Sequence, residues 1–173
     1  MTNRLRVMLV ALATIVVSGT YAQVGRPSLS IGAELGIPAG TLNNTQKIGI
    51  GGSAKAAFPV GPETDITVSA GYVSFSGVEI GSFKYPALNF IPLKAGVRYR
   101  FIPGGFYLEP QLGYTSISAA NNGGSTGGFT YAANAGYMIN SQWDLSARYE
   151  AVSLKNDVLY PQVGVRLAYS FKL

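Results

Sequence analysis

Apolar and polar residues alternate along eight stretches of this chain, which is the pattern of β-strands with one apolar face. In the first stretch Leu29, Ile31 and Ala33 share one face, while Ser30 and Gly32 share the other. Each stretch has about nine to 13 residues, against about five or six in globular strands and about 9–11 in tilted strands that cross a bilayer. The eight predicted strands are residues 27–38, 47–60, 65–75, 90–101, 106–115, 129–140, 143–151 and 162–173.

The connections between these stretches alternate between long and short. Outer-membrane barrels have this alternation, with short periplasmic turns and longer external loops. The sequence therefore predicts an all-β fold, an eight-stranded antiparallel up-and-down transmembrane β-barrel with both termini in the periplasm. The long connections are 39–46, 76–89, 116–128 and 152–161, and the short ones are 61–64, 102–105 and 141–142.

One face of the predicted strands is free of charge, and the charged residues fall on the opposite face. A charge that faces lipid at the bilayer midplane costs about 2–4 kcal/mol, so the charged face is expected to line the lumen. Eight strands enclose a lumen that side chains can fill, and charges buried there must be paired. We expect this pairing to form a plug that stiffens the barrel, with an ion gate as the alternative. The predicted lumen network comprises Glu34, Lys94, Arg98, Arg100, Glu109, Arg148, Glu150 and Arg166.

Aromatic residues of the apolar face lie near the strand ends, where girdles at the two membrane interfaces would place them. The general enrichment of aromatic residues in strands is the alternative explanation. The predicted girdle residues are Phe58, Tyr72, Tyr99, Phe101, Phe106, Tyr114, Tyr137, Trp143, Tyr149 and Phe171.

Two prolines, Pro92 and Pro110, fall within predicted strands, the first on the inward face and the second on the outward face. Because proline has no N–H group to donate to a ladder, each position predicts a β-bulge or a missing hydrogen bond.

The first 22 residues have the pattern of a secretory signal peptide. Arg4 and Arg6 precede an apolar run over 7–17, and small residues precede a cleavage site after Ala22. An uncleaved anchor is the alternative, but a run of this length is too short to cross about 30 Å of hydrocarbon. The predicted organisation is a signal peptide at 1–22 and one barrel domain at 23–173.

The composition excludes several classes of function. The chain is 47% hydrophobic, has 12% charged residues, and contains neither cysteine nor histidine. These absences exclude disulfide scaffolds, zinc fingers, thiol nucleophiles and catalytic triads that use histidine. Of the net charge of +5, two basic residues belong to the predicted signal peptide, so the balance does not indicate a nucleic-acid partner. No cofactor is expected.

Carboxylate pairs are the remaining candidates for catalysis. Asp65 and Asp144 lie near short turns and Asp157 lies in a long connection, so these three cannot meet at one site. Glu34, Glu109 and Glu150 are expected in the lumen among cations. An enzyme is therefore not expected.

The last stretch, 163–173, alternates toward an aromatic end, and it resembles the C-terminal strand of outer-membrane barrels. Stretches 91–99 and 106–114 also resemble the porin-like outer-membrane β-barrel domain family, which is related in shape to OmpA and OmpX. The resemblance implies location in the outer membrane of a Gram-negative cell and recognition by the barrel assembly machinery. The residues that would carry this assembly signal are Tyr169, Phe171 and Leu173, with Leu173 standing at the terminal position that is aromatic in the family.

The predicted function is that of a structural or interaction protein. Its barrel serves as an anchor, and its external loops bind a ligand or partner of unknown identity. Connection 76–89 mixes apolar and charged residues and is the best candidate contact surface, whereas the glycine-rich connection 116–128 is expected to be flexible. A narrow ion channel and a soluble periplasmic barrel that binds an apolar ligand are the alternatives. A closed barrel leaves no strand edge, so a monomer in outer-membrane lipid is expected.

Overall fold

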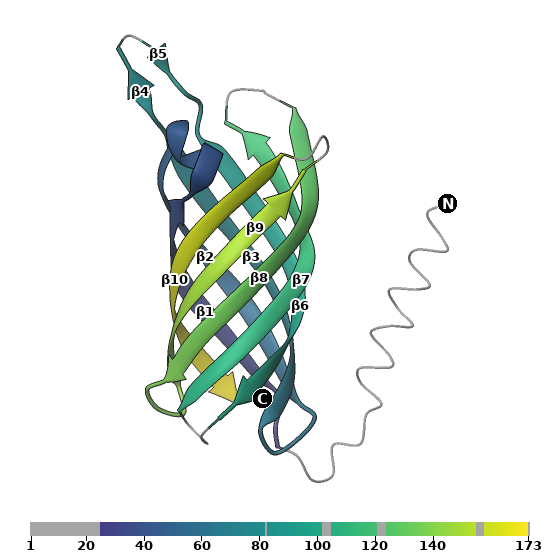
Figure 1. Ribbon diagram of the computed structural model, residues 1–173. Helices are drawn as coiled ribbons and strands as arrows, with labels where there is room; N and C mark the ends of the chain where they lie inside the picture. Colours follow the sequence, from purple (N-terminus) through teal and green to yellow (C-terminus); the bar gives the residue numbers. More distant parts are fainter. Residues whose placement is uncertain (1–24, 82, 102–104, 121–123, 155–157, 173) are drawn as a thin grey trace, which may run out of the picture.

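The computed structural model describes residues 25–81, 83–101, 105–120, 124–154 and 158–172. Eight long strands form one closed antiparallel barrel, in the order β1-β10-β9-β8-β7-β6-β3-β2 (Figure 1). The predicted all-β, eight-stranded up-and-down barrel is therefore confirmed. The long strands are β1 (Ser28–Pro38), β2 (Gln46–Pro59), β3 (Thr64–Gly77), β6 (Leu88–Arg100), β7 (Phe106–Ala119), β8 (Ser125–Met138), β9 (Trp143–Ser153) and β10 (Leu159–Lys172).

Three short elements lie at the end of the barrel that carries the long connections. The 3-10 helix η1 (Gly40–Asn44) joins β1 to β2. Strands β4 (Glu79–Ile80) and β5 (Phe83–Lys84) pair with each other, and their hairpin projects beyond the barrel (Figure 1). Within the described residues, no helix is both long enough and apolar enough to span a membrane. The predicted signal peptide, residues 1–22, lies outside the described residues.

The barrel closes where the first strand pairs with the last. The register of β1 against β10 runs from Ser28 opposite Lys172 to Pro38 opposite Gln162 without a shift. Every long strand therefore has a partner on each side, and the wall presents no free edge at which another chain could pair.

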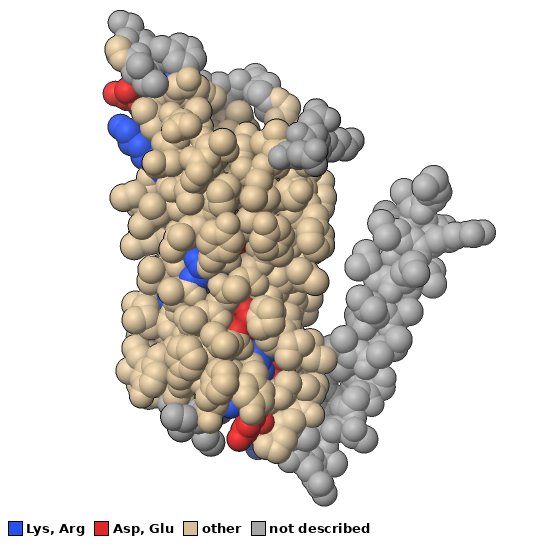
Figure 2. Space-filling view, viewed as in Figure 1, with Lys and Arg blue, Asp and Glu red and all other residues tan. Residues whose placement is uncertain are grey.

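Burial alternates along each strand with the predicted phase. Ile50 and Leu112 on the outer wall are 67% and 59% exposed, whereas Glu109 and Glu150 are fully buried inside. Figure 2 shows a wall of uncharged residues over most of its height, with charges at the hairpin and between side chains lower down. The predicted placement of the apolar face outside and the charged face inside is confirmed.

The strands extend further into the long connections than the sequence predicts. Connection 116–128, expected to be a flexible loop, is largely strand, because β7 continues to Ala119 and β8 begins at Ser125. The two strands pair there as far as Ser118 opposite Ser125. The physical reason is that an antiparallel ladder satisfies the backbone of small polar residues as well as that of apolar ones.

Neither proline causes a bulge. The ladder between β6 and β7 has the same register on both sides of Pro110, and the ladder between β3 and β6 has the same register on both sides of Pro92. Pairing is interrupted at both positions. Of the two predicted outcomes, the missing hydrogen bond is the correct one, because the absent N–H removes bonds on one side without inserting a residue.

An apolar cluster occupies the lumen at the end with the long connections. The sequence interpretation of a lumen lined by small and charged residues is wrong at this end. The rings of Phe75 and Phe90 meet edge to face with centroids 5.0 Å apart, and helix η1 places Leu42 over them. We call this cluster the apolar plug; its buried members are Leu42, Val73, Phe75, Phe90, Ile117 and Val152.

Two glycines make room for the plug. A Cβ atom at Gly49 would lie 2.6 Å from the Phe75 ring, and one at Gly36 would lie 2.8 Å from it. These distances are far below van der Waals contact, so a side chain at either position would displace the ring. The polar face is rich in glycine at this level because bulky plug residues fill the same cross-section.

Candidate functional site

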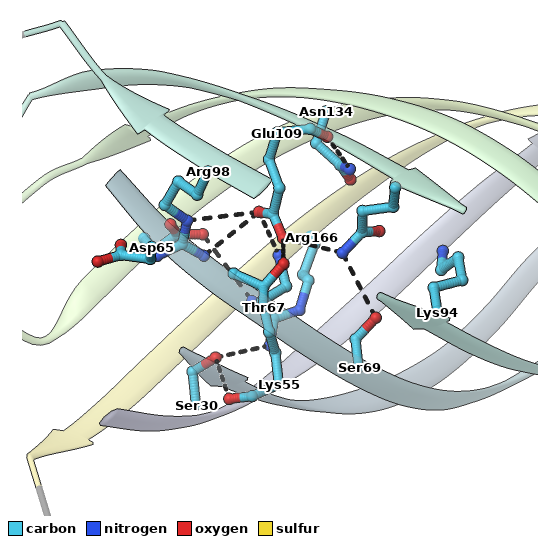
Figure 3. A network of polar contacts seen from close by, with 12 residues as sticks. Ser30, Lys55, Asp65, Thr67, Ser69, Lys94, Arg98, Glu109, Asn134 and Arg166 are labelled. Atoms are coloured by element: carbon cyan, nitrogen blue, oxygen red, sulfur yellow. Dashed lines mark hydrogen bonds and ion pairs between the residues drawn. The ribbon is translucent and has the colours of Figure 1, made fainter. Parts of the chain in front are cut away.

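The charged lumen is organised around three buried glutamates. Glu109 on β7 receives the largest number of partners: Lys55 Nζ lies 2.7 Å from its Oε2, and Thr67 Oγ1 donates to its Oε1 at 2.7 Å. Gln111 Nε2 also donates to Oε1 at 2.8 Å, and Arg98 lies 3.4 Å from Oε2. Figure 3 shows Lys55, Thr67 and Arg98 gathered around this carboxylate. Such multiple pairing is what a buried carboxylate needs to remain charged.

Glu150 on β9 is the second centre. It forms an ion pair with Lys94 of β6, and it accepts a hydrogen bond from Gln162 Nε2 at 2.7 Å. Arg148 Nε lies 3.3 Å from its Oε2. The contacts join β6, β9 and β10, so this carboxylate links strands on opposite sides of the lumen.

Glu34 on β1 is the third centre. Arg148 Nη2 donates to its Oε2 at 2.8 Å, and Arg166 Nε lies 3.7 Å from its Oε1. Arg166 also donates to the hydroxyls of Ser53, at 2.8 Å, and Ser30, at 3.1 Å. Arg148 therefore bridges Glu34 and Glu150, which makes the second and third centres one continuous network.

A fourth group of charges lies toward the short turns. Asp65 forms an ion pair with Arg100, and Arg166 Nη1 lies 3.9 Å from Asp144 Oδ1. The guanidinium of Arg98 lies 4.5 Å from the centroid of the Tyr107 ring, within the range of a cation–π interaction. This end of the lumen is thus filled by charged and aromatic side chains rather than by the apolar plug.

The eight residues of the predicted lumen network all lie on inward positions. Seven of them join through the three glutamates, but Arg100 pairs instead with Asp65. Lys55 was left out of the prediction although it lies on the same face, and it forms one of the shortest ion pairs in the lumen. Tyr107 was also missed; its position two residues before Glu109 gives it the same inward direction, and that spacing is the signal that identifies it.

The predicted girdle residues lie on the outer wall. Nine of the ten are more than two-fifths exposed, and Phe58 is half-buried. Near the short turns, Tyr99 meets Phe101 edge to face, and Tyr169 meets Trp143 and Phe171 in the same way. Tyr169 and Phe171 are also two of the predicted assembly-signal residues, and Leu173 lies outside the described residues.

Tyrosine hydroxyls at this end bond to turn residues. The Tyr99 hydroxyl donates to Glu63 Oε2 at 2.9 Å, and the Tyr169 hydroxyl accepts from Gln142 Nε2 at 2.6 Å. Each ring thus has an apolar body on the wall and a polar tip at the barrel rim, which is the arrangement of aromatic residues at a membrane interface.

The β4–β5 hairpin is the element that extends furthest at the long-connection end. Glu79 and Lys84 form an exposed ion pair of 2.7 Å across it. The hydrogen bond from Lys84 holds the pKa of the Glu79 carboxyl below its ordinary value. The backbone N–H of Val78 donates to Thr45 O at 2.9 Å, so the base of the hairpin is attached to the connection that contains η1.

The lumen glutamates are held in ion pairs with cations. The described residues contain no group of three or more carboxylate, histidine or cysteine side chains that could hold a metal ion. The glutamates lie below the apolar plug, on the side of the short turns.

Comparison with known proteins identifies a family. The family model described as "Outer membrane protein beta-barrel domain" matches residues 8–171. No curated protein matches the chain in a sequence search.

Several solved structures have the same fold. Ail, the attachment invasion locus protein of Yersinia pestis, solved in complex with the heparin analogue sucrose octasulfate, superposes with a TM-score of 0.60 at 18% identity. The match covers 86% of this chain and 100% of that one. Neisserial surface protein A has a TM-score of 0.60 at 14% identity, with 85% and 97% covered. The N-terminal β-barrel domain of Pseudomonas aeruginosa OprF has a TM-score of 0.58 at 15% identity, with 86% and 100% covered.

Proposed function

The chain belongs to the outer membrane protein beta-barrel domain family, and on that premise we propose that it is a non-enzymatic surface protein, in which the barrel is an anchor and the long connections are the contact surface. The outer wall faces lipid, and the filled lumen gives the barrel its rigidity. One observation carries the proposal: the barrel is apolar outside and, inside, is occupied by paired charges and closed by the apolar plug. A barrel built in this way holds its loops at the membrane surface without needing an open passage.

The orientation follows from the lengths of the connections. The long connections, with η1 and the β4–β5 hairpin, lie outside the cell, and the short turns lie in the periplasm together with both termini. Residues 1–22 act as the signal peptide. In the periplasm, the assembly machinery reads the C-terminal strand through Tyr169, Phe171 and Leu173. The product is a monomer, since both edges of the strand order are paired.

The contact surface centres on connection 76–89, which contains the β4–β5 hairpin. Ail was solved with a sulfated ligand, and a polyanion of that kind needs a cluster of cations. By sequence, the long connections and adjoining strand ends carry the lysines Lys47, Lys84 and Lys155 against the carboxylates Glu79 and Asp157, and Lys84 already pairs with Glu79. These charges nearly balance, which favours a protein partner over a polyanion.

Two features support a role without catalysis. The chain has no histidine, and the lumen glutamates are paired with cations. The apolar plug opposes the narrow ion channel, because a dry cluster of aliphatic and aromatic side chains bars hydrated ions. In a planar lipid bilayer the barrel is therefore expected to pass no steady current. A Phe75→Ala variant opens the plug, so it tests whether the plug is what blocks the current. Steady current through the unaltered barrel would contradict the proposed closed lumen.

Fractionation tests the location. Native protein is followed through inner-membrane, outer-membrane and periplasmic fractions, and each fraction is run unheated and boiled on a denaturing gel. We expect recovery in the outer membrane with a shift in mobility between the two lanes. Recovery as a soluble periplasmic protein would overturn the lipid-facing wall and favour the ligand-binding alternative.

Surface labelling tests the orientation. The chain has no cysteine, so a single new thiol reports on its own position. Asn43→Cys in η1 and Ser141→Cys in the β8–β9 turn form a matched pair, because both positions are exposed and lie at opposite ends. On intact cells, a membrane-impermeant maleimide is expected to label the first variant and spare the second until the outer membrane is opened. The reverse pattern would invert the proposed topology.

A further inference from the structure

A small cavity lies in the middle of the lumen, among its cations. The charged residues that line it are Lys55, Lys94, Arg148 and Arg166, with Glu34 as the carboxylate. The space measures about 10 Å³, close to the least that one water-sized sphere requires. In Figure 3, Lys55, Lys94 and Arg166 reach the lumen from β2, β6 and β10, which lie on different sides of the barrel.

Donors outnumber acceptors at this cavity. Arg148 Nε and Arg166 Nη1 are buried and make no hydrogen bond within the described residues; the carboxylate oxygens beside them are Glu150 Oε2 at 3.3 Å and Asp144 Oδ1 at 3.9 Å. An ammonium group has three N–H donors, but the hydrogen bonds described for Lys55 and Lys94 use one from each, to Glu109 and Glu150. The lumen therefore presents several N–H groups to a space that supplies few oxygen atoms.

The balance of charges in the lumen also shows a shortage of negative groups. On the described strands, the buried and partly buried charges of the lumen are six cations and five carboxylates, which leaves one positive charge in excess. A buried charge without a counter-charge is strongly unfavourable. Water would accept hydrogen bonds here but would not remove the excess charge. The cations are Lys55, Lys94, Arg98, Arg100, Arg148 and Arg166, and the carboxylates are Glu34, Asp65, Glu109, Asp144 and Glu150.

We propose that this cavity binds one small monovalent anion, of the size of chloride. The anion accepts hydrogen bonds from the N–H groups that Lys55 and Lys94 leave unused, is attracted by the guanidinium charges of Arg148 and Arg166, and supplies the missing negative charge. Small shifts of the flexible lysine and arginine ends enlarge the space from that of a water to that of the ion. The bound anion ties together β2, β6, β9 and β10, so it acts as an internal cross-link of the wall. This site is independent of the contact surface proposed above.

Bromide provides the direct test, because it replaces chloride and scatters anomalously. Crystals of the detergent-solubilised barrel are grown in sodium bromide, and the anomalous map is calculated at the bromine absorption edge. We expect a peak between Lys94 and Arg166. An ordered water at that position, with no anomalous signal, would overturn the proposal.

Thermal unfolding gives a second test in solution. The Tm of the barrel is compared in sodium chloride and in sodium gluconate at equal ionic strength, since gluconate is too large to enter. Binding to the folded state alone is expected to raise Tm in chloride by about 2–4 °C. Lys94→Gln is expected to abolish the difference, and the exposed control Lys84→Gln to retain it. Equal Tm values in the two salts, or a difference that survives in Lys94→Gln, would contradict the site. If Lys94→Gln does not fold, the bromide map of the unaltered barrel decides.

Discussion

Lys55 Nζ lies 2.7 Å from Glu109 Oε2, and this ion pair joins β2 to β7, two strands that are separated in the wall by β3 and β6. The backbone ladders connect only neighbouring strands. Ion pairs that cross the lumen therefore stiffen the barrel in a direction that its hydrogen-bonded wall does not. The same is true of Lys94 and Glu150, on β6 and β9.

Removing the charge of Glu109 is predicted to destabilise the barrel strongly. Glu109→Gln leaves Lys55 and Arg98 buried without their carboxylate, and breaking such a buried pair costs about 3–5 kcal/mol. The free energy of unfolding is measured by urea titration in lipid vesicles, with the fluorescence of Trp143, the chain's single tryptophan, as the signal. Glu79→Gln, on the exposed hairpin, is the control and is expected to leave stability unchanged. A loss below about 1 kcal/mol for Glu109→Gln would mean that the network contributes little.

Alanine substitutions at two glycines of β2 compare the packing inside the barrel with the packing on its outer wall. Gly49→Ala places a Cβ atom against the Phe75 ring, and overpacking of this kind typically costs about 1–3 kcal/mol. At Gly52 the nearest atom to a new Cβ is Gly32 O at 3.4 Å, which is ordinary contact. We therefore expect Gly52→Ala to be nearly neutral in the same urea titration. Equal effects at the two sites would contradict the close approach of Phe75.

A charge on the outer wall tests its contact with lipid. Leu112 lies near the middle of β7 and is 59% exposed, so Leu112→Arg is expected to cost about 2–4 kcal/mol in the free energy of unfolding in vesicles. Ile139 lies just beyond the end of β8 and is also exposed, and Ile139→Arg is expected to cost about 0–1 kcal/mol. A wall that faced water would tolerate both substitutions equally.

The ion pair of the hairpin is expected to lower the pKa of the Glu79 carboxyl, which can be measured. The hydrogen bond and the charge of Lys84 hold the pKa of the Glu79 carboxyl below 4.5, with a smaller effect from Lys47. Lys84→Gln is expected to raise this pKa toward 4.5, and Lys47→Gln to raise it less. The pKa is measured by NMR titration of the carboxyl carbon.

The sign of the pH dependence follows from that lowered pKa. Since the folded state has the lower pKa, the pair stabilises the hairpin at pH values above 4.5, and the stabilisation is lost as the pH falls through the lowered value. A Glu79 pKa that does not respond to Lys84→Gln would show that the pair is not formed in solution.

Alternation was enough to sort the residues of each strand into two faces, and the cost of a charge in lipid then determined which face points inward. Period two is a local property, so Glu109 and Leu112 were assigned to opposite sides of the wall without knowledge of their neighbours. The same count by twos identifies residues that the sequence interpretation passed over. Phe75 shares its face with Asp65, and Tyr107 shares its face with Glu109, so both could have been placed in the lumen.

The pairing of charges was decided only by the tertiary structure. Which cation meets Glu109 depends on the combined register of the three ladders between β2 and β7, and no single stretch of sequence contains that combination. Thus Arg100 meets Asp65 rather than a glutamate, and Arg148 reaches Glu34 from 114 residues away in sequence. Leu42 enters the plug because η1 folds back over the mouth, and no periodic pattern describes a connection of that kind. Local periodicity determines direction, whereas closure of the sheet determines the partners.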